Sequence, residues 1–498
     1  MARFVVLIAA IAFAVLAAGC GSSERVGEEH SRTVHVLTML KPIGNAEELG
    51  PFAGEVERLS HGKLRIRIIP SGYSDRPDFE AATVQDMQHG RADLSWAASR
   101  VWDEFGAHRL RALHAPFLID SYALEQRVLQ SDLAAGMLDE LQPLGLVGIG
   151  ILPGGMRHPF GVSRRLAAPS DYTDLTIGTQ ESRIADATMR AFGARPIRVP
   201  ADTLGLKAVD GLEQRVYTLQ GDRLAVKGSH VTANVDLWPR PLVIYAAARA
   251  YKRLTADERE VLHKAASDAL PKAVPMARHA DAESTGDLCR KGDVSFDLAA
   301  PSELRALRQA VAPVYRELER DPATRAAIEQ IETLKTQVGQ PADVLPRCTR
   351  RTSAAPAAAT ALDGVWQMDA NQKVAHADDT DENWGHWIFV FKRGRFAITQ
   401  ENARACTWGY GTFSVRGDRT SWKFTDGGGL APNNAENKPG EFFVFGLSAY
   451  HDTLRLTPAH GAISPFNFRV KPWRRLAAAP SRRFFSKRCP PPVRALSG

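Results

Sequence analysis

The sequence lacks the short motifs that mark most catalytic and nucleotide-binding sites. It contains no Gly-x-Ser-x-Gly, no P-loop, no Gly-x-Gly-x-x-Gly at a strand-to-helix turn and no Cys-x-x-Cys. His158 and His386 have no second histidine or carboxylate at metal-ligand spacing. The acidic residues 378–382 lack the spacing and the glycine of an EF-hand and are interpreted as a solvated loop. We therefore expect no catalytic residue, metal or cofactor, and interpret the chain as a protein that is not an enzyme.

Cysteine is scarce, with five residues in the whole chain. Cys20 lies at the end of an N-terminal apolar segment, and the others are Cys289, Cys348, Cys406 and Cys489. Four cysteines in an oxidising compartment suggest two disulfides, and three pairings are possible. Because a linker separates the first two cysteines from the last two, we expect Cys289–Cys348 and Cys406–Cys489.

Only one long apolar run is present, at residues 4–18, and a positive charge at Arg3 precedes it. The run is shorter than the roughly 20 residues of a membrane-spanning helix. It ends in Leu-Ala-Ala-Gly before Cys20, as in lipoprotein signals. We expect a signal peptide at residues 1–19, acylation of Cys20 and a tether at residues 20–32, with the protein outside the cytoplasm on a bacterial membrane. An ordinary secretory signal is the alternative.

Charge of one sign is not in large excess. The chain has 63 Lys and Arg against 56 Asp and Glu, a net charge of +7, and the two signs are scattered. This distribution does not favour a nucleic-acid partner. Residues 479–498 are more basic and are interpreted as a solvated tail, with contact to anionic lipid as the alternative. A length of 498 residues suggests two or three folding units.

Residues 33–350 alternate strand-like and helix-like segments. Residues 34–37 and 64–69 are strand-like, and residues 46–59 between them carry apolar side chains at helical spacing. Residues 79–89 form a further helical segment that leads into another strand. This alternation predicts α/β units around open sheets.

Residues 182–214 carry the most informative pattern. A helical segment ends in Ala-Phe-Gly-Ala at 191–194, a strand-like segment follows at 195–199, and Val-Asp-Gly-Leu-Glu-Gln occupies 209–214. This order resembles the second-lobe signature of the DctP-type solute-binding proteins of TRAP transporters. Thr255, which opens a capping box, resembles the start of that family's long helix.

The resemblance covers about residues 33–337 and includes Pro-Phe-Leu-Ile-Asp within residues 115–122. It implies a two-lobed, periplasmic-binding-protein-like α/β domain that closes on a small-molecule solute between its lobes. It also implies integral-membrane permease subunits of the TRAP type as partners.

The family's main ligand anchor is absent. In DctP-type proteins an arginine just before the signature holds a solute carboxylate, and the matching residue here is Gly178. We expect this glycine to leave both a charge deficit and a void. The match places Arg157 beside the solute, with a surface position as the alternative, and Glu213 and Gln214 on the pair that lines the cleft.

Other side chains are candidates for the same cleft. Arg183 and Arg240 are the cations that we expect to compensate for Gly178, because a guanidinium donates two parallel hydrogen bonds to a carboxylate. Trp96 and Trp238 are candidates for stacking on a solute, with packed core positions as the alternative.

The composition of the sequence changes at the linker of residues 351–361, which is rich in alanine. Residues 362–478 contain short aromatic-rich segments separated by turns, which predict an antiparallel barrel or sandwich. Gly364 and Trp366 form a Gly-x-Trp pattern that resembles the first strand of lipocalin-like barrels.

These observations predict a lipid-anchored solute-binding protein that captures a small, organic-acid-like solute for a TRAP-type transporter. The alternative is a lipoprotein of the same fold that has lost transport and acts as a sensor or interaction scaffold. A hydrolase has only the acidic residues in its favour.

Overall fold

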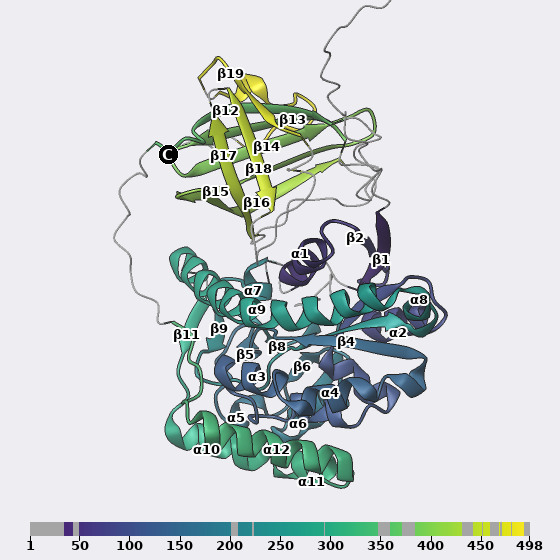
Figure 1. Cartoon of the computed structure of the whole chain (residues 1–498). Helices are drawn as coiled ribbons and strands as arrows, with labels where there is room; N and C mark the ends of the chain where they lie inside the picture. Colours follow the sequence, from purple (N-terminus) through teal and green to yellow (C-terminus); the bar gives the residue numbers. More distant parts are fainter. Residues whose placement is uncertain are drawn as a thin grey trace, which may run out of the picture. The chain divides into compact units, whose positions relative to one another are not determined.

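The computed structural model describes residues 34–42, 49–200, 208–221, 224–292, 294–346, 359–370, 384–430, 442–450, 452–458, 468, 471–479 and 481–492. The expected signal peptide, Cys20, Cys348, the acidic residues 378–382 and most of the expected linker lie outside these residues. The described chain forms an α/β part (residues 34–346) and an all-β part (residues 359–492), shown in Figure 1 and described separately below. No helix within the described ranges is long and apolar enough to span a membrane.

The α/β part contains two sheets, as expected for two lobes. The first sheet has the order β2-β1-β3-β10-β4, in which β1 runs parallel to β2 and β3, and β10 is antiparallel to β3 and β4. Its strands are β1 (His35–Lys41), β2 (Leu64–Pro70), β3 (Leu94–Ala98), β4 (Leu146–Leu152) and β10 (Leu242–Ala247).

The second sheet has the order β11-β9-β5-β8-β6-β7. Its strands are β5 (His158–Gly161), β6 (Thr176–Thr179), β7 (Arg195–Arg198), β8 (Gly211–Gln214), β9 (Ser229–Thr232) and β11 (Val294–Asp297). The chain crosses between the sheets after β4 and again before β10. The two crossing segments pair through Arg157 and Trp238, with Arg157 N donating to Trp238 O over 2.9 Å.

A long helix, α9 (Ala256–Lys291), packs beside β4 of the first sheet and beside α7 and β11 of the second lobe (Figure 1). The capping box predicted at Thr255 is confirmed, because Glu258 N donates to Thr255 Oγ1 over 3.2 Å and Thr255 N donates to Glu258 Oε2 over 2.9 Å. The helix ends at Gly292, whose φ of 69° suits glycine.

The remaining helices cover the two sheets and the crossing segments. They are α1 (Gly50–Leu59), α2 (Phe79–Gln88), η2 (Ser99–Phe105), η3 (Arg109–His114), α3 (Tyr122–Leu129), α4 (Asp132–Asp139), η4 (Gln142–Leu144), α5 (Pro169–Tyr172), α6 (Arg183–Ala191), α7 (Val216–Gly221), α8 (Ala248–Arg253), α10 (Pro301–Ala310), α11 (Ala312–Leu318) and α12 (Pro322–Val338). The main apolar core includes Trp96 and Trp102 from the first lobe and Ile177 and Met189 from the second.

The all-β part is a closed antiparallel barrel of consecutive strands. These are β12 (Gly364–Ala370), β13 (Gly385–Lys392), β14 (Arg395–Glu401), β15 (Cys406–Arg416), β16 (Arg419–Leu430), β17 (Phe442–Tyr450), β18 (Thr453–Pro458) and β19 (Trp473–Leu476). Its interior is filled by aromatic rings around Phe389, Trp422 and Phe445, with centroids as close as 4.6 Å. These rings form one buried apolar cluster among the described residues of the barrel, and eight strands suit either such a packed interior or one that holds a small ligand.

Residues 481–492, the described part of the predicted solvated tail, are attached to the barrel, although their basic side chains are exposed. Arg475 lies in β19, and its guanidinium stacks 4.3 Å from the Trp366 ring centroid. A short η7 (Arg482–Phe484) follows, Phe485 is buried, and Cys489 forms a disulfide with Cys406. The barrel holds this segment by covalent and apolar contacts.

Candidate functional site

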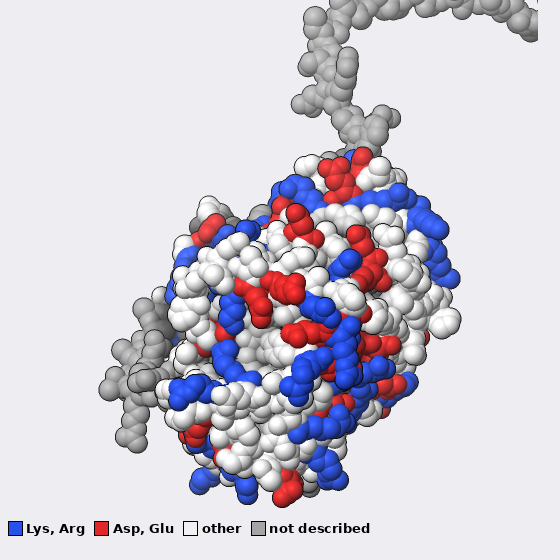
Figure 2. All heavy atoms as spheres, turned by 90° about the horizontal axis from the view of Figure 1, so that it is seen from below, with Lys and Arg blue, Asp and Glu red and all other residues white. Residues whose placement is uncertain are grey.

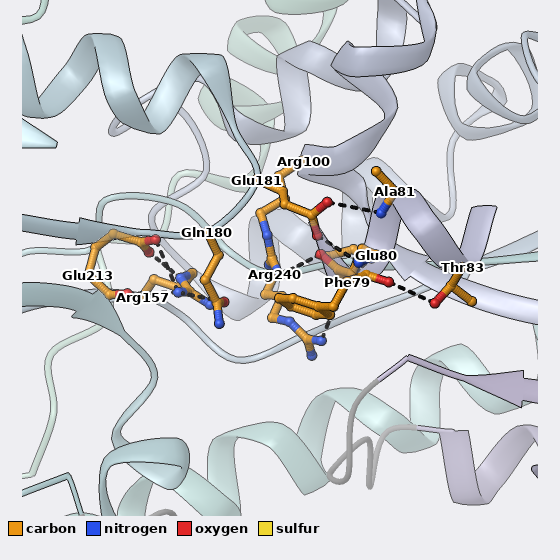
Figure 3. Close-up of polar contacts among 11 residues, drawn as sticks. Phe79, Glu80, Ala81, Thr83, Arg100, Arg157, Gln180, Glu181, Glu213 and Arg240 are labelled. Carbon is orange, nitrogen blue, oxygen red and sulfur yellow. Dashed lines mark hydrogen bonds and ion pairs between the residues drawn. The ribbon is translucent and has the colours of Figure 1, made fainter. Parts of the chain in front are cut away.

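Charged side chains are buried together where the two lobes meet. Four arginines and three glutamates there are each at most 3 % exposed: Arg100, Arg157, Arg215, Arg240, Glu80, Glu181 and Glu213. Such side chains are almost never fully buried unless they are paired. This concentration makes the junction of the lobes the candidate functional site (Figure 3).

Arg157 lies on the crossing segment after β4 and is neutralised by Glu213 of β8. Its Nε pairs with Glu213 Oε2, and its Nη2 donates to the main-chain oxygen of Glu213 over 2.7 Å and to Oε1 over 3.1 Å. Nη2 also lies 3.2 Å from Gln180 Oε1. Nη1 is the one guanidinium nitrogen of Arg157 for which the described residues provide no partner.

A second cluster surrounds Glu80 in the first lobe. Arg100 Nη2 lies 2.5 Å from Glu80 Oε2, and Arg240 Nη2 lies 3.8 Å from Glu80 Oε1. The Ala98 main-chain N donates to Glu80 Oε1 over 3.0 Å. The Arg240 guanidinium also lies over the Trp96 ring, 5.3 Å from its centroid, where a cation is attracted to the ring face.

Glu181 connects the lobes. It follows β6 in the second lobe, and its carboxylate accepts hydrogen bonds from the main-chain N of Glu80 (2.7 Å) and Ala81 (3.0 Å) in the first turn of α2 (Figure 3). Burial and the nearby Glu80 carboxylate raise the pKa of Glu181 to about 8, while the two main-chain donors and Arg100 oppose this shift.

The rim of the junction carries a further contact between lobes. Glu104 of η2 accepts from Arg183 Nη2 over 3.0 Å and from Arg198 Nη2 over 2.8 Å. Ser182 caps α6 by accepting from Ala185 N, and Arg183 then projects outward with an exposed side chain. Arg183 therefore does not take the place of the family's missing anchor.

Gly178 leaves no void, and that expectation is wrong. A Cβ atom at this position would lie 2.4 Å from Leu212 Cδ2 and 3.1 Å from Val199 Cγ1. The side-chain direction of Gly178 points into the apolar cluster that contains Leu212 and Val199. The absence of a cation at this position is therefore built into the packing of β6 against β8.

The other expected ligand residues are buried and engaged by the protein itself. Gln214 Oε1 accepts from the main-chain N of Arg215 over 3.0 Å. Trp96 and Trp238 have no exposed surface, and the Trp238 ring lies 4.3 Å from that of His114. The two tryptophans match the packed core alternative.

Sequence reasoning missed five residues of the site, namely Glu80, Arg100, Gln180, Glu181 and Arg215. A usable signal was present for three of them. Arg100 follows the apolar strand β3, and Gln180 and Glu181 follow β6, so they lie at the carboxyl ends of strands, where open α/β sheets bind ligands.

The described residues contain no group of three or more side chains suited to hold a metal ion. Lys and Arg are interspersed with Asp and Glu on the face seen in Figure 2. A cavity of about 440 Å³ lies against the outer wall of the barrel, between β13, β14 and residues 484–488.

The α/β part matches a known family. The family model of the bacterial extracellular solute-binding proteins, family 7 (DctP), matches residues 33–321. The C4-dicarboxylate-binding periplasmic protein DctP of Rhodobacter capsulatus is 22 % identical over 61 % of this chain and 90 % of its own. The protein of the same name from Shewanella loihica is 23 % identical over 54 % and 79 %.

Solved structures share the fold. A TRAP periplasmic solute-binding protein of Bradyrhizobium in complex with galacturonate has a TM-score of 0.54 at 19 % identity, covering 60 % of this chain and all of the other. One from Shewanella oneidensis with bound succinate has a TM-score of 0.53 at 20 % identity, covering 60 % and 99 %. With the family match over residues 33–321, the chain belongs to the DctP family of bacterial extracellular solute-binding proteins.

Proposed function

We propose that this protein is the extracytoplasmic solute receptor of a TRAP-type transporter, and that it binds a small organic acid between its lobes. The observation that carries the proposal is the Nη1 atom of Arg157. This atom belongs to a buried cation at the lobe crossover, and the described residues leave it without a partner.

The chemistry of the site supports a carboxylate as the ligand group. A guanidinium donates charge-assisted hydrogen bonds, which are about twice as strong as neutral ones. Glu213 fixes the orientation of Arg157 by holding Nε and Nη2, which leaves Nη1 to meet a solute. The solutes named for the neighbouring structures, galacturonate and succinate, are carboxylates.

The receptor role also requires a lobe closure that buries the solute. Glu181 and Glu104 provide polar contacts that form only when the lobes meet. In the proposed cycle, the closed receptor presents the solute to integral-membrane permease subunits, and acylation of Cys20 keeps it near them.

A thermal-shift screen across sugar acids, hydroxy acids and dicarboxylates tests the proposal. A true ligand at about 100 times its Kd stabilises the fold by roughly 2.7 kcal/mol. Arg157→Lys keeps the charge that buried Glu213 needs but loses the planar fork, so we expect it to abolish the shift. Arg190→Lys, an exposed position on α6, is the matched control and keeps the shift.

A sensor or scaffold without transport is the second candidate. It is favoured by the internal pairing of the site, because Glu213 already neutralises Arg157 and Glu80 already pairs with Arg100. A screen in which no organic acid shifts the melting temperature of the wild type would favour this candidate over the receptor.

A further inference from the structure

Glu181 is bound to α2 rather than to Arg157. Glu181 reaches from the second lobe to the first turn of α2 (Phe79–Gln88), where its two oxygens accept the main-chain N–H groups of Glu80 and Ala81. The N-terminus of a helix attracts anions, because its first N–H groups lack partners within the helix. The chain therefore supplies its own carboxyl group at a place suited to a solute carboxylate.

A second observation concerns Arg100, which pairs with the side chain of Glu80 at the start of the same helix. Arg100 pairs with Glu80 through Nη2, but its Nε is buried and has no hydrogen-bond partner among the described residues. The charge of Arg100 also acts on Glu181. A donor left unsatisfied in the interior carries a free-energy cost of about 1–3 kcal/mol, which a ligand oxygen would remove.

We propose that Glu181 is a specificity-determining residue that occupies the position of a second solute carboxylate, so that the cleft accepts solutes with one acidic group. This inference rests on the proposed receptor function. A second solute carboxylate at α2 would have to displace Glu181. It would then lie near the Glu80 carboxylate, and the two like charges would repel each other.

The rest of the site agrees with a single acidic group. Glu213 engages Nε and Nη2 of Arg157, which leaves only the Nη1 nitrogen of this guanidinium for a solute. Arg100 and Arg240 share Glu80. At Gly178, the neighbouring Leu212 fills the direction in which a side chain would project.

Titration calorimetry with matched pairs of acids tests the inference. The pairs are galactonate with galactarate and 4-hydroxybutyrate with succinate, in which the members differ by one carboxylate. In whichever pair shows binding, we expect the wild type to bind the monoacid more tightly than the diacid. Glu181→Ala should raise the affinity for the diacid about tenfold or more, which corresponds to about 1.4 kcal/mol.

The control for this titration is Glu104→Gln, which weakens the rim contact between the same lobes without touching α2. It should leave the ratio of diacid to monoacid affinity unchanged. Glu181→Gln, with nearly the same volume, replaces Glu181→Ala if the latter fails to fold. A diacid affinity that stays unchanged in both Glu181 variants, with monoacid binding intact, would overturn the inference.

Hydrogen exchange gives a readout that needs no solute. The amides of Glu80 and Ala81 should exchange about tenfold faster or more in Glu181→Ala than in the wild type and in Glu104→Gln. Equal rates in all three proteins would mean that Glu181 does not hold α2, and the inference would fail. If these rates differ but no acid binds any variant, the receptor function fails together with the selectivity that depends on it.

Discussion

At the scale of single residues, the site is defined by which buried charges compensate one another. Arg157 with Glu213 and Arg100 with Glu80 are opposite charges whose desolvation is offset within the protein. Glu181 differs, because its nearest charged neighbours include another carboxylate and its pKa is raised to about 8. The ionisation of Glu181 therefore falls within the ordinary range of pH.

The raised pKa of Glu181 predicts a pH dependence of stability. In the folded protein this pKa is about 8, against an ordinary value of 4.5, so between these values the folded state holds a proton that the unfolded state has lost. The stability that Glu181 contributes is therefore present at low pH and decreases as the pH rises toward 8. Chemical denaturation at pH 5 and pH 8 measures this change.

Glu181→Gln, which cannot titrate, is the reference for that measurement. Relative to this variant, we expect the wild type to lose about 1 kcal/mol or more of unfolding free energy between the two pH values. A difference that stays constant, or that moves in favour of the wild type at pH 8, would contradict the burial of Glu181 beside Glu80.

At the scale of elements, the packing of β6 against β8 leaves no room for an arginine side chain at position 178. Leu212 of β8 fills the direction in which a side chain at Gly178 of β6 would project. Overpacking a well-packed core has a cost of about 1–3 kcal/mol. We therefore expect Gly178→Arg to lower the unfolding free energy by at least that amount and not to create a carboxylate anchor.

Thermal melting of Gly178→Arg alone and together with Leu212→Ala checks this prediction. The second substitution makes room, so the double variant should be more stable than the sum of the two separate effects predicts. A Gly178→Arg variant as stable as the wild type would show that the strands adapt more easily than their packing implies.

The barrel has its own structural constraint in the Cys406–Cys489 disulfide, with a sequence separation of 83 residues. On the chain-entropy estimate, closing a loop of this length stabilises the fold by roughly 4 kcal/mol. We expect Cys489→Ser to lower the melting temperature of the barrel and to expose Phe485. Calorimetry that finds an unchanged barrel transition would contradict this role.

Some helices and strands could be predicted from local sequence patterns, and others could not. The start of α9 was predictable because Thr255 and Glu258 form a capping box within one turn. Most barrel strands were predictable because their aromatic residues lie in short runs between turns. By contrast, β19 is only four residues long and carries two arginines, so its composition resembles a solvated segment.

The site itself depended on contacts that the sequence does not reveal. Glu181 and the first turn of α2 are 101 residues apart, and no local pattern links them. The position of Arg157 followed from the family match, but its neutralisation by Glu213, 56 residues away, did not. The filling of the space at Gly178 by Leu212 is a tertiary effect of the same kind.

At the scale of the whole molecule, the apolar segment before Cys20 predicts that acylation holds the receptor at a membrane surface. A single acyl chain binds membranes only marginally, so stable anchoring needs more than one chain or a basic patch. We expect the wild type to partition into detergent with an acyl mass on Cys20, and Cys20→Ala to remain aqueous. Recovery of unmodified wild type in the aqueous phase would contradict the anchor.

In the proposed receptor, Arg157 is oriented by Glu213 between two closing lobes and binds the carboxylate of a small organic acid. Titration calorimetry of the acid identified by the screen, with the wild type and Arg157→Lys, tests this binding most directly. We expect one site per chain and an affinity loss of about 2–5 kcal/mol in Arg157→Lys. Binding of equal affinity to both proteins would contradict it.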